Sequence, residues 1–405
     1  MPAPQGMQKL WQQLAIATNW PVLVAVAVLS ALGIVSIWAE SPKDGVRQLV
    51  FLGVAITCMA LFQAVNYQKI GRLAWGFYGV SILLVLYTVL GSTIGGKSPL
   101  PGVNYVNGAY NWIRFGPVGV QPAELMKISF ILVLGRYLRF RNNYRTFAGL
   151  LPPFLLALVP LALILKQPDL GTALVFIPIL FAMLFVAGAK VSHLLAIVLI
   201  GASLVPLAWM AGKDEDGNPH SRIPGLRYLP TLVKDYQRAR VKAMFAGEND
   251  PATMKGVAYQ SQRAMIAFAS GGPTGKGPGN IPVGQHVPEA HNDMVFALIG
   301  EQFGFIGSAV VLGAYIVLFA AGIEISAATR EPFGRLIALG IVAMLAGQTF
   351  INLMVATRLM PVTGVTLPFV SYGGSSLLAS YMAAGLLLNV GQNRPIVMAR
   401  ESFEF

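Results

Sequence analysis

The sequence predicts an all-α, polytopic membrane protein, and three observations indicate this class. Of its 405 residues, 55% are hydrophobic and only 11% are charged, whereas a typical soluble domain has about 25% charged residues. The mean hydropathy is +0.63. Apolar runs long enough to cross about 30 Å of hydrocarbon recur along the chain. An ordinary soluble enzyme and a disordered chain are excluded, because so few charges cannot coat a soluble surface.

The apolar runs predict a single membrane domain over residues 1–405, built as a bundle of about ten transmembrane helices. One large loop, residues 212–292, separates the seventh and eighth helices and is rich in charge. The first run ends in Trp38-Ala39-Glu40 without a small-residue cleavage pattern, so we interpret it as a retained span rather than a signal peptide. The expected spans lie near residues 21–38, 48–65, 73–91, 121–139, 149–165, 170–188, 191–211, 294–323, 336–357 and 368–391.

The distribution of Lys and Arg predicts that both termini are cytoplasmic. In that orientation the short inside segments hold twelve of these residues and the short outside loops hold six, as the positive-inside rule favours. The large loop is then extracytoplasmic, on the side of a bacterial inner membrane that has no ATP or nucleotide sugars. The twelve are Lys9, Lys69, Arg72, Arg136, Arg139, Arg141, Arg145, Lys190, Arg330, Arg335, Arg394 and Arg400, and the six are Lys43, Arg47, Lys97, Arg114, Lys166 and Arg358.

Composition and spacing exclude several classes of function. The net charge is +12, but the sequence has no basic stripe with interleaved aromatic residues. We attribute the charge to the positive-inside distribution of Lys and Arg and predict no nucleic-acid partner. The single cysteine, Cys58, excludes a disulfide scaffold and a thiolate metal site. Residues 270–277 are rich in Gly and Pro, but the spacing from Gly271 to Lys276 differs from that of a Walker loop, and Gly277 stands where that loop needs Ser or Thr. We therefore exclude nucleotide binding by this segment.

Ionisable residues in the spans need a reason, since a charge near the bilayer centre costs about 3 kcal/mol or more. Glu124 and Lys127 are three residues apart and share a helical face, either as a buried ion pair or as a polar wall that meets an anionic headgroup. Asp169 follows Pro168 at the start of a span and fits a helix cap. Arg358 fits an interfacial snorkelling residue or a phosphate ligand.

The densest group of polar residues is 286–293, with Glu301 two turns further along the eighth span. Asp293 falls where the large loop enters that span, and partial desolvation there raises a carboxylate pKa toward the range of a general base. Two alternatives remain open from the residues alone. The two His and the carboxylates of this segment are also compatible with a metal site, although the spacing matches no known zinc pattern, and Asp293 is compatible with a plain helix cap.

Seven motifs of the chain resemble those of the SEDS proteins (shape, elongation, division and sporulation), the family of RodA and FtsW. They occur in the family's order across residues 108–376, and each is weak alone whereas the set is specific. The motifs are GAYNWI (108–113), QPAELMK (121–127), QPDLGT (167–172), AFASGG (267–272), PEAHND (288–293), PVTG (361–364) and LPFVSYGGSS (367–376).

The resemblance implies a peptidoglycan glycosyltransferase, which polymerises lipid II on the outer face of the cytoplasmic membrane and releases undecaprenyl pyrophosphate. The family's essential acidic residue matches Asp293, which would act as the general base. Lys127, Arg114 and Arg358 are, in that order, our candidates to assist pyrophosphate departure, with a divalent cation (Mg or Mn) as the alternative. Further residues expected at the substrate site are Glu124, Trp112, Asp169, His291, Glu289 and Ser371.

Departures from the family pattern bear on the subtype. Asn111 stands where the family has Arg before the Trp, and Arg114 is a candidate to replace it. Asn292 stands where Thr is common. Asn19-Trp20 and Gly275-Lys276-Gly277 favour RodA, whereas Thr366 favours FtsW, and we favour RodA and hence cell elongation.

The same resemblance implies partners: a class B penicillin-binding protein that supplies the transpeptidase, and other proteins of the wall-synthesis complex. Two other functions are compatible with the sequence, a lipid II flippase and a non-catalytic scaffold. The enzyme is favoured because the acidic residues gather at one membrane face, whereas a flippase needs polar groups through the full depth of the membrane.

Overall fold

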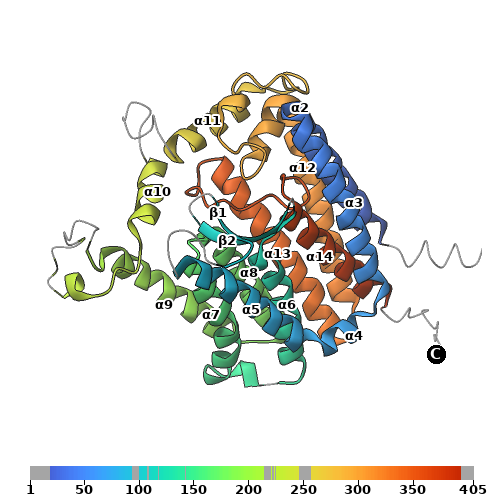
Figure 1. Ribbon diagram of the computed structural model, residues 1–405. Helices are drawn as coiled ribbons and strands as arrows, with labels where there is room; N and C mark the ends of the chain where they lie inside the picture. The colour runs from blue at the N-terminus through green and yellow to red at the C-terminus, as the bar shows by residue number, and fades with distance from the viewer. Residues whose placement is uncertain are drawn as a thin grey trace, which may run out of the picture.

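The computed structural model describes residues 19–93, 100–106, 109–116, 118–141, 143–213, 220, 223, 225–245 and 257–393. They form a bundle of long helices with one small sheet beside it (Figure 1). In chain order the elements are α2 (Trp20–Glu40), α3 (Pro42–Ala64), α4 (Tyr67–Arg72), α5 (Ala74–Thr93), β1 (Val103–Val106), β2 (Ala109–Phe115), β3 (Val118–Val120), α6 (Pro122–Arg139), η1 (Asn143–Arg145), η2 (Ala148–Leu150), α7 (Leu151–Lys166), α8 (Leu170–Ala187), α9 (Val191–Met210), η3 (Leu226–Tyr228), α10 (Asp235–Phe245), α11 (Val257–Ser270), η5 (Gly284–His286), α12 (Val295–Ala328), α13 (Pro332–Ala356) and α14 (Gly374–Gln392).

The predicted helical membrane class is confirmed. Nine of the described helices are long and apolar enough to cross a membrane. Helix α6 joins them in the bundle as an 18-residue helix that carries four charged side chains, Glu124, Lys127, Arg136 and Arg139. The structure adds a feature that the sequence did not predict, a three-stranded antiparallel sheet in the order β1-β2-β3 between α5 and α6 along the chain.

Three helices depart from the expected bounds. Helix α3 begins at Pro42 rather than near residue 48, because the Ser41 hydroxyl caps it by accepting from the Asp44 amide. Helix α14 begins at Gly374 rather than near residue 368, since the backbone φ is 66° at Phe369 and 149° at Gly373, which no helix allows.

The third departure is a break inside α12, at Gly304, where φ is 64° and ψ is −157°. The Gly/Pro segment 270–277 fills the break: Gly272 and Pro273 carbonyls accept from the amides of Phe305 and Ile306 at 2.9 and 3.1 Å. A Cβ at Gly304 would lie 2.3 Å from the Gly275 amide nitrogen, so only glycine fits this close approach. Residues 295–303 therefore form a short separate helix at the end of the bundle.

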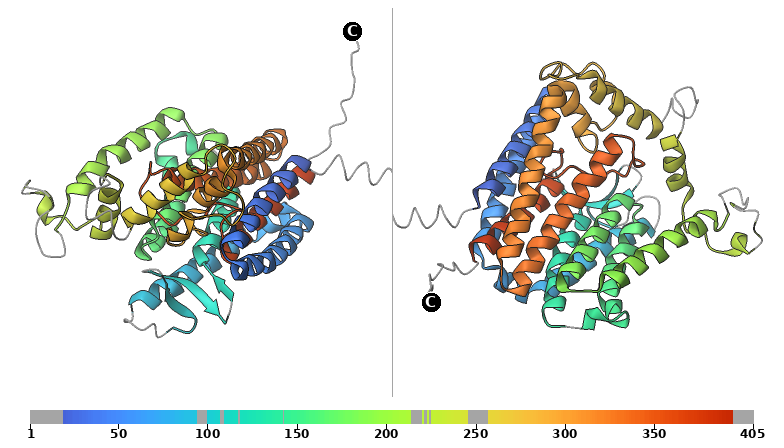
Figure 2. Two further views of the ribbon diagram at one scale, coloured as in Figure 1. Left: turned by 90° about the horizontal axis from the view of Figure 1, so that it is seen from above. Right: turned by 180° about the vertical axis from the view of Figure 1, so that it is seen from behind.

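Burial divides the bundle into an inner and an outer layer. In its most apolar stretch α14 is 83% buried and α13 is 67% buried, whereas α9 is only 6% buried. Helix α9 diverges from the bundle, and α10 and α11 then arch back over the end of the bundle to reach α12 (Figure 1; Figure 2, right). The described residues of the loop predicted at 212–292 therefore include a cap built from α10 and α11, whereas residues 214–219 and 246–256 of that loop lie outside the described residues.

The two ends of the described chain lie together at the other end of the bundle. A Cβ at Gly391 of α14 would lie 2.2 Å from the side-chain Nδ2 atom of Asn19, the residue just before α2. An even number of crossings brings the chain back to the side where it started. The cap formed by α10 and α11 consequently covers the end at which α2 finishes and α6, α8, α12 and α14 begin.

Candidate functional site

Asp293 lies at the base of the cap, immediately before α12. Its side chain is 8% exposed. Gln260 of α11 donates to the Asp293 Oδ1 atom at 3.2 Å and to the Pro288 carbonyl at 2.9 Å. The buried amide of Asn352, in α13, donates to the Asp293 and Val365 carbonyls at 2.8 and 2.7 Å. Helix α11 thus holds the carboxylate of Asp293, and α13 holds its main chain.

Burial raises the pKa of Asp293 to about 6. Its hydrogen bond to the backbone acts in the opposite direction, as do the positive charges of Arg240 and His291, while the Glu289 carboxylate raises the pKa further. A carboxyl group with a pKa near the ambient pH is ionised in much of the population and accepts a proton readily. Asp293 therefore has a pKa suited to a general base, and its catalytic role stays a prediction.

His291 lies between α2 and the segment before α14. Its Nδ1 atom is 3.3 Å from the Glu40 Oε1 atom at the end of α2. Its ring packs edge-on against Tyr372, with centroids 5.3 Å apart, and its carbonyl accepts from the Tyr372 amide at 2.8 Å. Glu289 is exposed on the same turn and accepts from the Asn292 side chain. Both predicted residues thus lie on the turn that carries Asp293.

Arg240 of the cap and Arg358, just after α13, line a small pocket beside this turn. Arg240 of α10 donates to the Val362 carbonyl at 3.1 Å, and Arg358 donates to the Ala243 carbonyl at 3.3 Å. The full lining is Arg240, Ala243, Met244, Ser261, Arg358, Met360, Pro361 and Val362. These residues include no carboxylate, and Arg240 lies close enough to Asp293 to lower its pKa, so the pocket is positively charged and adjoins the proposed base.

A second polar cluster gathers at the starts of α6 and α8. Lys127 Nζ is 2.9 Å from Glu124 Oε1, and both side chains are almost fully buried. Asp169 caps α8 by accepting from the Thr172 amide at 3.0 Å, and its other oxygen accepts from the Gln121 side chain at 2.9 Å. Burial raises the pKa of Asp169. We call these five residues the Asp169 cluster.

Helix α10 connects the Asp169 cluster to Asp293. The Tyr236 hydroxyl lies within electrostatic range of Asp169 and of Arg240, and burial raises the pKa of this tyrosine. The Arg240 guanidinium lies over the Tyr236 ring, 5.7 Å from its centroid. The predicted residues Asp169, Arg358 and Asp293 therefore contribute to one end of the bundle beneath the same helix.

Other predicted site residues lie further from Asp293. Trp112 and Arg114 belong to β2, where Trp112 pairs with Asn104 of β1 and Arg114 pairs with Gly119 of β3. Trp112 is half-buried and Arg114 is exposed. Ser371 is buried and its hydroxyl accepts from the Leu367 amide at 2.7 Å, which folds the segment before α14.

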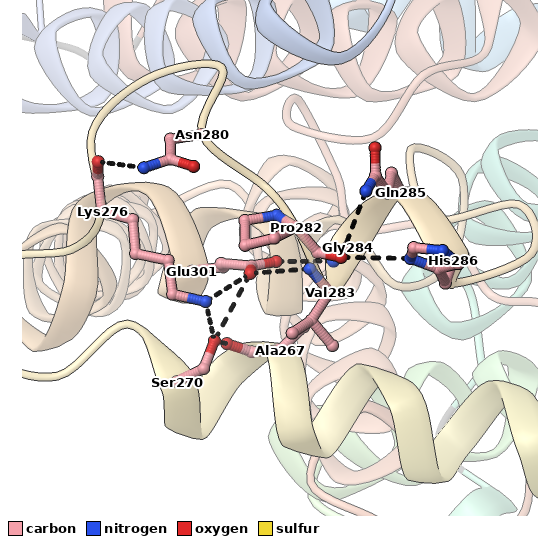
Figure 3. A network of polar contacts seen from close by, with 10 residues as sticks. All are labelled: Ala267, Ser270, Lys276, Asn280, Pro282, Val283, Gly284, Gln285, His286 and Glu301. Atoms are coloured by element: carbon pink, nitrogen blue, oxygen red, sulfur yellow. Dashed lines mark hydrogen bonds and ion pairs between the residues drawn. The ribbon is translucent and has the colours of Figure 1, made fainter.

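Glu301 belongs to a polar network that holds the cap onto the short helix 295–303 (Figure 3). Its fully buried carboxylate lies 2.7 Å from Lys276 Nζ and accepts from the Val283 and Gly284 amides at 3.1 and 2.6 Å. The Lys276 ammonium also donates to the Ser270 hydroxyl at 2.7 Å. Both carboxylate oxygens of Glu301 thus accept hydrogen bonds from the protein itself.

The described histidines and carboxylates near Asp293 do not gather into one group that could bind a metal ion. His286 contacts the Pro282 carbonyl, and His291 contacts Glu40, so the two histidines point to different partners. Among the residues that the structure describes, no three His, Cys, Asp or Glu side chains gather closely enough to hold a metal ion. We therefore route no chemical step through a divalent cation.

Four residues that contact the site were missed by the sequence analysis: Glu40, Arg240, Gln260 and Asn352. Arg240 lies in the large loop 212–292, which the sequence analysis described only as rich in charge. Asn352 is a polar residue within the ninth span, and that is a signal, because a buried amide in a membrane helix needs partners. Glu40 and Gln260 gave no signal of their own, since long-range packing alone brings Gln260 to Asp293 and Glu40 to His291.

This arrangement defines a class: a polytopic helical membrane protein with a buried carboxylate under a helical cap at one end of the bundle. The chain belongs to the family of cell cycle proteins that comprises FtsW, RodA and SpoVE, because the sequence profile of that family matches residues 8–395.

Individual relatives and a solved structure agree with this assignment. The chain is 34% identical to a probable peptidoglycan glycosyltransferase FtsW of Trichlorobacter lovleyi, over 91% of this chain and 92% of that one. It is 27% identical to the peptidoglycan glycosyltransferase RodA of Treponema pallidum, over 92% and 97%. A chain in a peptidoglycan synthase complex, described as coordinating polymerization and crosslinking, matches with a TM-score of 0.74 and 33% identity, over 93% of this chain and 98% of that one.

Proposed function

We propose that this protein is a peptidoglycan glycosyltransferase that polymerises lipid II into glycan strands and releases undecaprenyl pyrophosphate. The observation that carries the proposal is the buried Asp293 carboxylate, whose pKa is raised to about 6, beside a pocket lined by Arg240 and Arg358. A base next to a cationic pocket suits a reaction in which a hydroxyl attacks and a pyrophosphate leaves. The relatives that carry this activity in their names support the same conclusion.

The reaction needs one proton acceptor and one site for the departing anion. Asp293 would accept the proton of the acceptor sugar's 4-hydroxyl as its oxygen bonds to the anomeric carbon of the donor. The bond from that carbon to the pyrophosphate oxygen breaks at the same time, with inversion at the anomeric carbon. The donor already carries its leaving group, so no nucleotide is consumed.

The structure supports a different order of the cationic candidates from the one that the sequence gave. Lys127 is neutralised by Glu124 within the Asp169 cluster, and Arg114 is exposed on the sheet. Arg358 lies in the same pocket as Arg240, next to Asp293. We therefore assign pyrophosphate binding first to Arg240 and Arg358, and keep Lys127 and Glu124 as a polar wall of the substrate cavity.

We further propose that the capped end faces the outside of the bacterial cytoplasmic membrane, with both termini cytoplasmic. Lipid II would reach Asp293 from the bilayer, and a class B penicillin-binding protein would crosslink the product within a larger wall-synthesis complex. Asn19-Trp20 and Gly275-Lys276-Gly277, the features that favour RodA, support a role in elongation. The FtsW names of several relatives support a role in division. Complementation of RodA-depleted and FtsW-depleted cells would separate these roles.

Reconstituted protein with labelled lipid II, assayed with and without the partner transpeptidase, tests the proposed activity. We expect glycan polymer from the native chain and none from Asp293→Asn. Movement of lipid II across the bilayer without polymer would instead establish a flippase. If the protein neither polymerises nor moves lipid II, a non-catalytic scaffold is the remaining function. The polar residues of the site lie at helix starts and in the cap, which supports the enzyme over a transporter that needs polar groups at all depths.

A further inference from the structure

The turn that carries Asp293 has little support from regular secondary structure. Residues 287–294 lie between η5 and α12 outside any helix or strand, and Glu289 has a positive φ of 53°. A general base must be held within a fraction of an ångström of its working position. The contacts that fix this turn are therefore part of the catalytic design.

His291 is the residue of the turn that contacts the end of α2. Glu40 at the end of α2 contacts its Nδ1 atom at 3.3 Å, and Tyr372 holds its ring and its carbonyl from the other side. The two side chains of the ion pair are 24% and 18% exposed, so the pair is shielded from much of the solvent. Since Glu40 belongs to a transmembrane helix, it joins the turn to the rigid bundle.

We propose that Glu40 is a positioning residue for Asp293, acting through its ion pair with His291. The pair anchors the turn to α2 and keeps a positive charge two residues before the base. This inference rests on the proposed function, because it assigns Asp293 the role of the base. It adds a residue that no motif of the sequence had indicated.

The charges around His291 and Asp293 determine in which direction the loss of Glu40 would shift their pKa values. The hydrogen bond to Glu40 raises the pKa of His291, and Glu289 on its own turn and Asp44 on α3 act in the same direction, while burial opposes them. Asp293 in turn faces Glu289, which raises its pKa, and Arg240 and His291, which lower it. Removing the Glu40 charge therefore lowers the pKa of His291, and a neutral His291 no longer lowers the pKa of Asp293.

The first experiment measures the protonation of His291 directly. The reconstituted full-length protein is modified with diethyl pyrocarbonate, which acylates the neutral but not the protonated imidazole, and the modification of His291 is followed by mass spectrometry across pH 5 to 9. In Glu40→Gln we expect His291 to become reactive at a lower pH than in the native chain. In the matched control Glu324→Gln, which changes an exposed carboxylate far along α12, the native profile should remain.

The second experiment measures lipid II polymerisation as a function of pH. Glu40→Gln should move the acidic limb of kcat/KM upward by about half a unit to one unit, because one positive charge near the base is lost. Glu40→Asp should restore part of the shift. The double variant Glu40→Gln/His291→Gln should be no worse than His291→Gln alone, since residues that act as a unit are not additive.

The outcomes distinguish this inference from the proposed function. An unchanged reactivity of His291 in Glu40→Gln, or additive losses in the double variant, would overturn the positioning role even if the native chain polymerises lipid II. A native chain without polymerase activity would overturn the proposed function, while the modification profile would still report on the Glu40–His291 pair.

Discussion

Asp293 and Glu301 are two buried carboxylates at either end of the same short helix, and the protein treats them in opposite ways. Glu301 is fully buried and accepts from an ammonium and two main-chain amides, all within 3.1 Å. Asp293 is nearly as buried, but its donors are the neutral side-chain amide of Gln260, at 3.2 Å, and a main-chain amide. Burial alone therefore does not separate a structural carboxylate from a reactive one.

The difference lies in how completely the negative charge is solvated by the protein. A buried carboxylate with a full set of donors stabilises the structure that supplies them, and removing it leaves those donors unpaired. A buried carboxylate with few donors is destabilised in its charged form, which raises its affinity for a proton. Glu301 is thus expected to determine the stability of the cap, and Asp293 the chemistry beneath it.

The substitution Asp293→Asn provides the strongest test of this contrast. We expect polymerisation to fall by about 10³-fold, because general-base catalysis contributes roughly 10²–10⁴-fold. The Tm should stay the same or rise, since the change removes a poorly solvated charge. Lipid II turnover and thermal unfolding are measured on the same preparation, and Asp293→Asn with substantial activity would eliminate this residue as the base.

Glu301→Gln should show the opposite pattern. The change leaves the Lys276 ammonium and the loop amides without their charged acceptor, which costs about 3 kcal/mol of stability. Thermal unfolding should occur at a lower temperature, while the folded fraction at low temperature keeps its kcat. Glu301→Leu combined with Lys276→Met provides the control, because removing both charges should restore much of the lost stability.

Arg240→Gln should have a smaller, selective effect. Loss of a charge-assisted hydrogen bond to the pyrophosphate should raise KM for lipid II about tenfold, a change of about 1.4 kcal/mol, with little change in Tm. Arg240→Lys should recover part of the affinity. Lys242→Gln is the matched control, because it removes one positive charge from an exposed position on the same helix; an equal loss in both variants would refute a specific role for Arg240.

The pH dependence should show the two consequences of one pKa. Burial raises the pKa of Asp293 to about 6, so kcat/KM for lipid II should be level above about pH 7 and fall tenfold per unit below pH 6. Because the folded-state pKa lies above the unfolded value, the group contributes stability that is present at low pH and lost as the pH rises through about 6. Asp293→Asn should remove both trends, as parallel activity and unfolding series would show.

The sequence predicted the helical class because each span must supply its own apolar surface and its own backbone hydrogen bonds, and both requirements are written in local composition. The exact bounds of the helices could not all be predicted from the sequence. The break at Gly304 and the late start of α14 depend on the segments 270–277 and 361–373, which fill or replace a helical turn through contacts distant in sequence. The sheet was missed because its strands are short and lie between two spans.

For the site, the sequence alone determined which carboxylate stands at the membrane border, since the position of Asp293 relative to an apolar run is a local property. The solvation of that carboxylate was decided only by the tertiary structure. Arg240, Gln260 and Asn352 come from three separate elements that packing brings to Asp293, and Glu40 comes from a fourth element that contacts His291 on the same turn. The same packing gives Glu301 its donors and withholds them from Asp293, because a side chain's charge is local whereas its solvation is a property of everything folded around it.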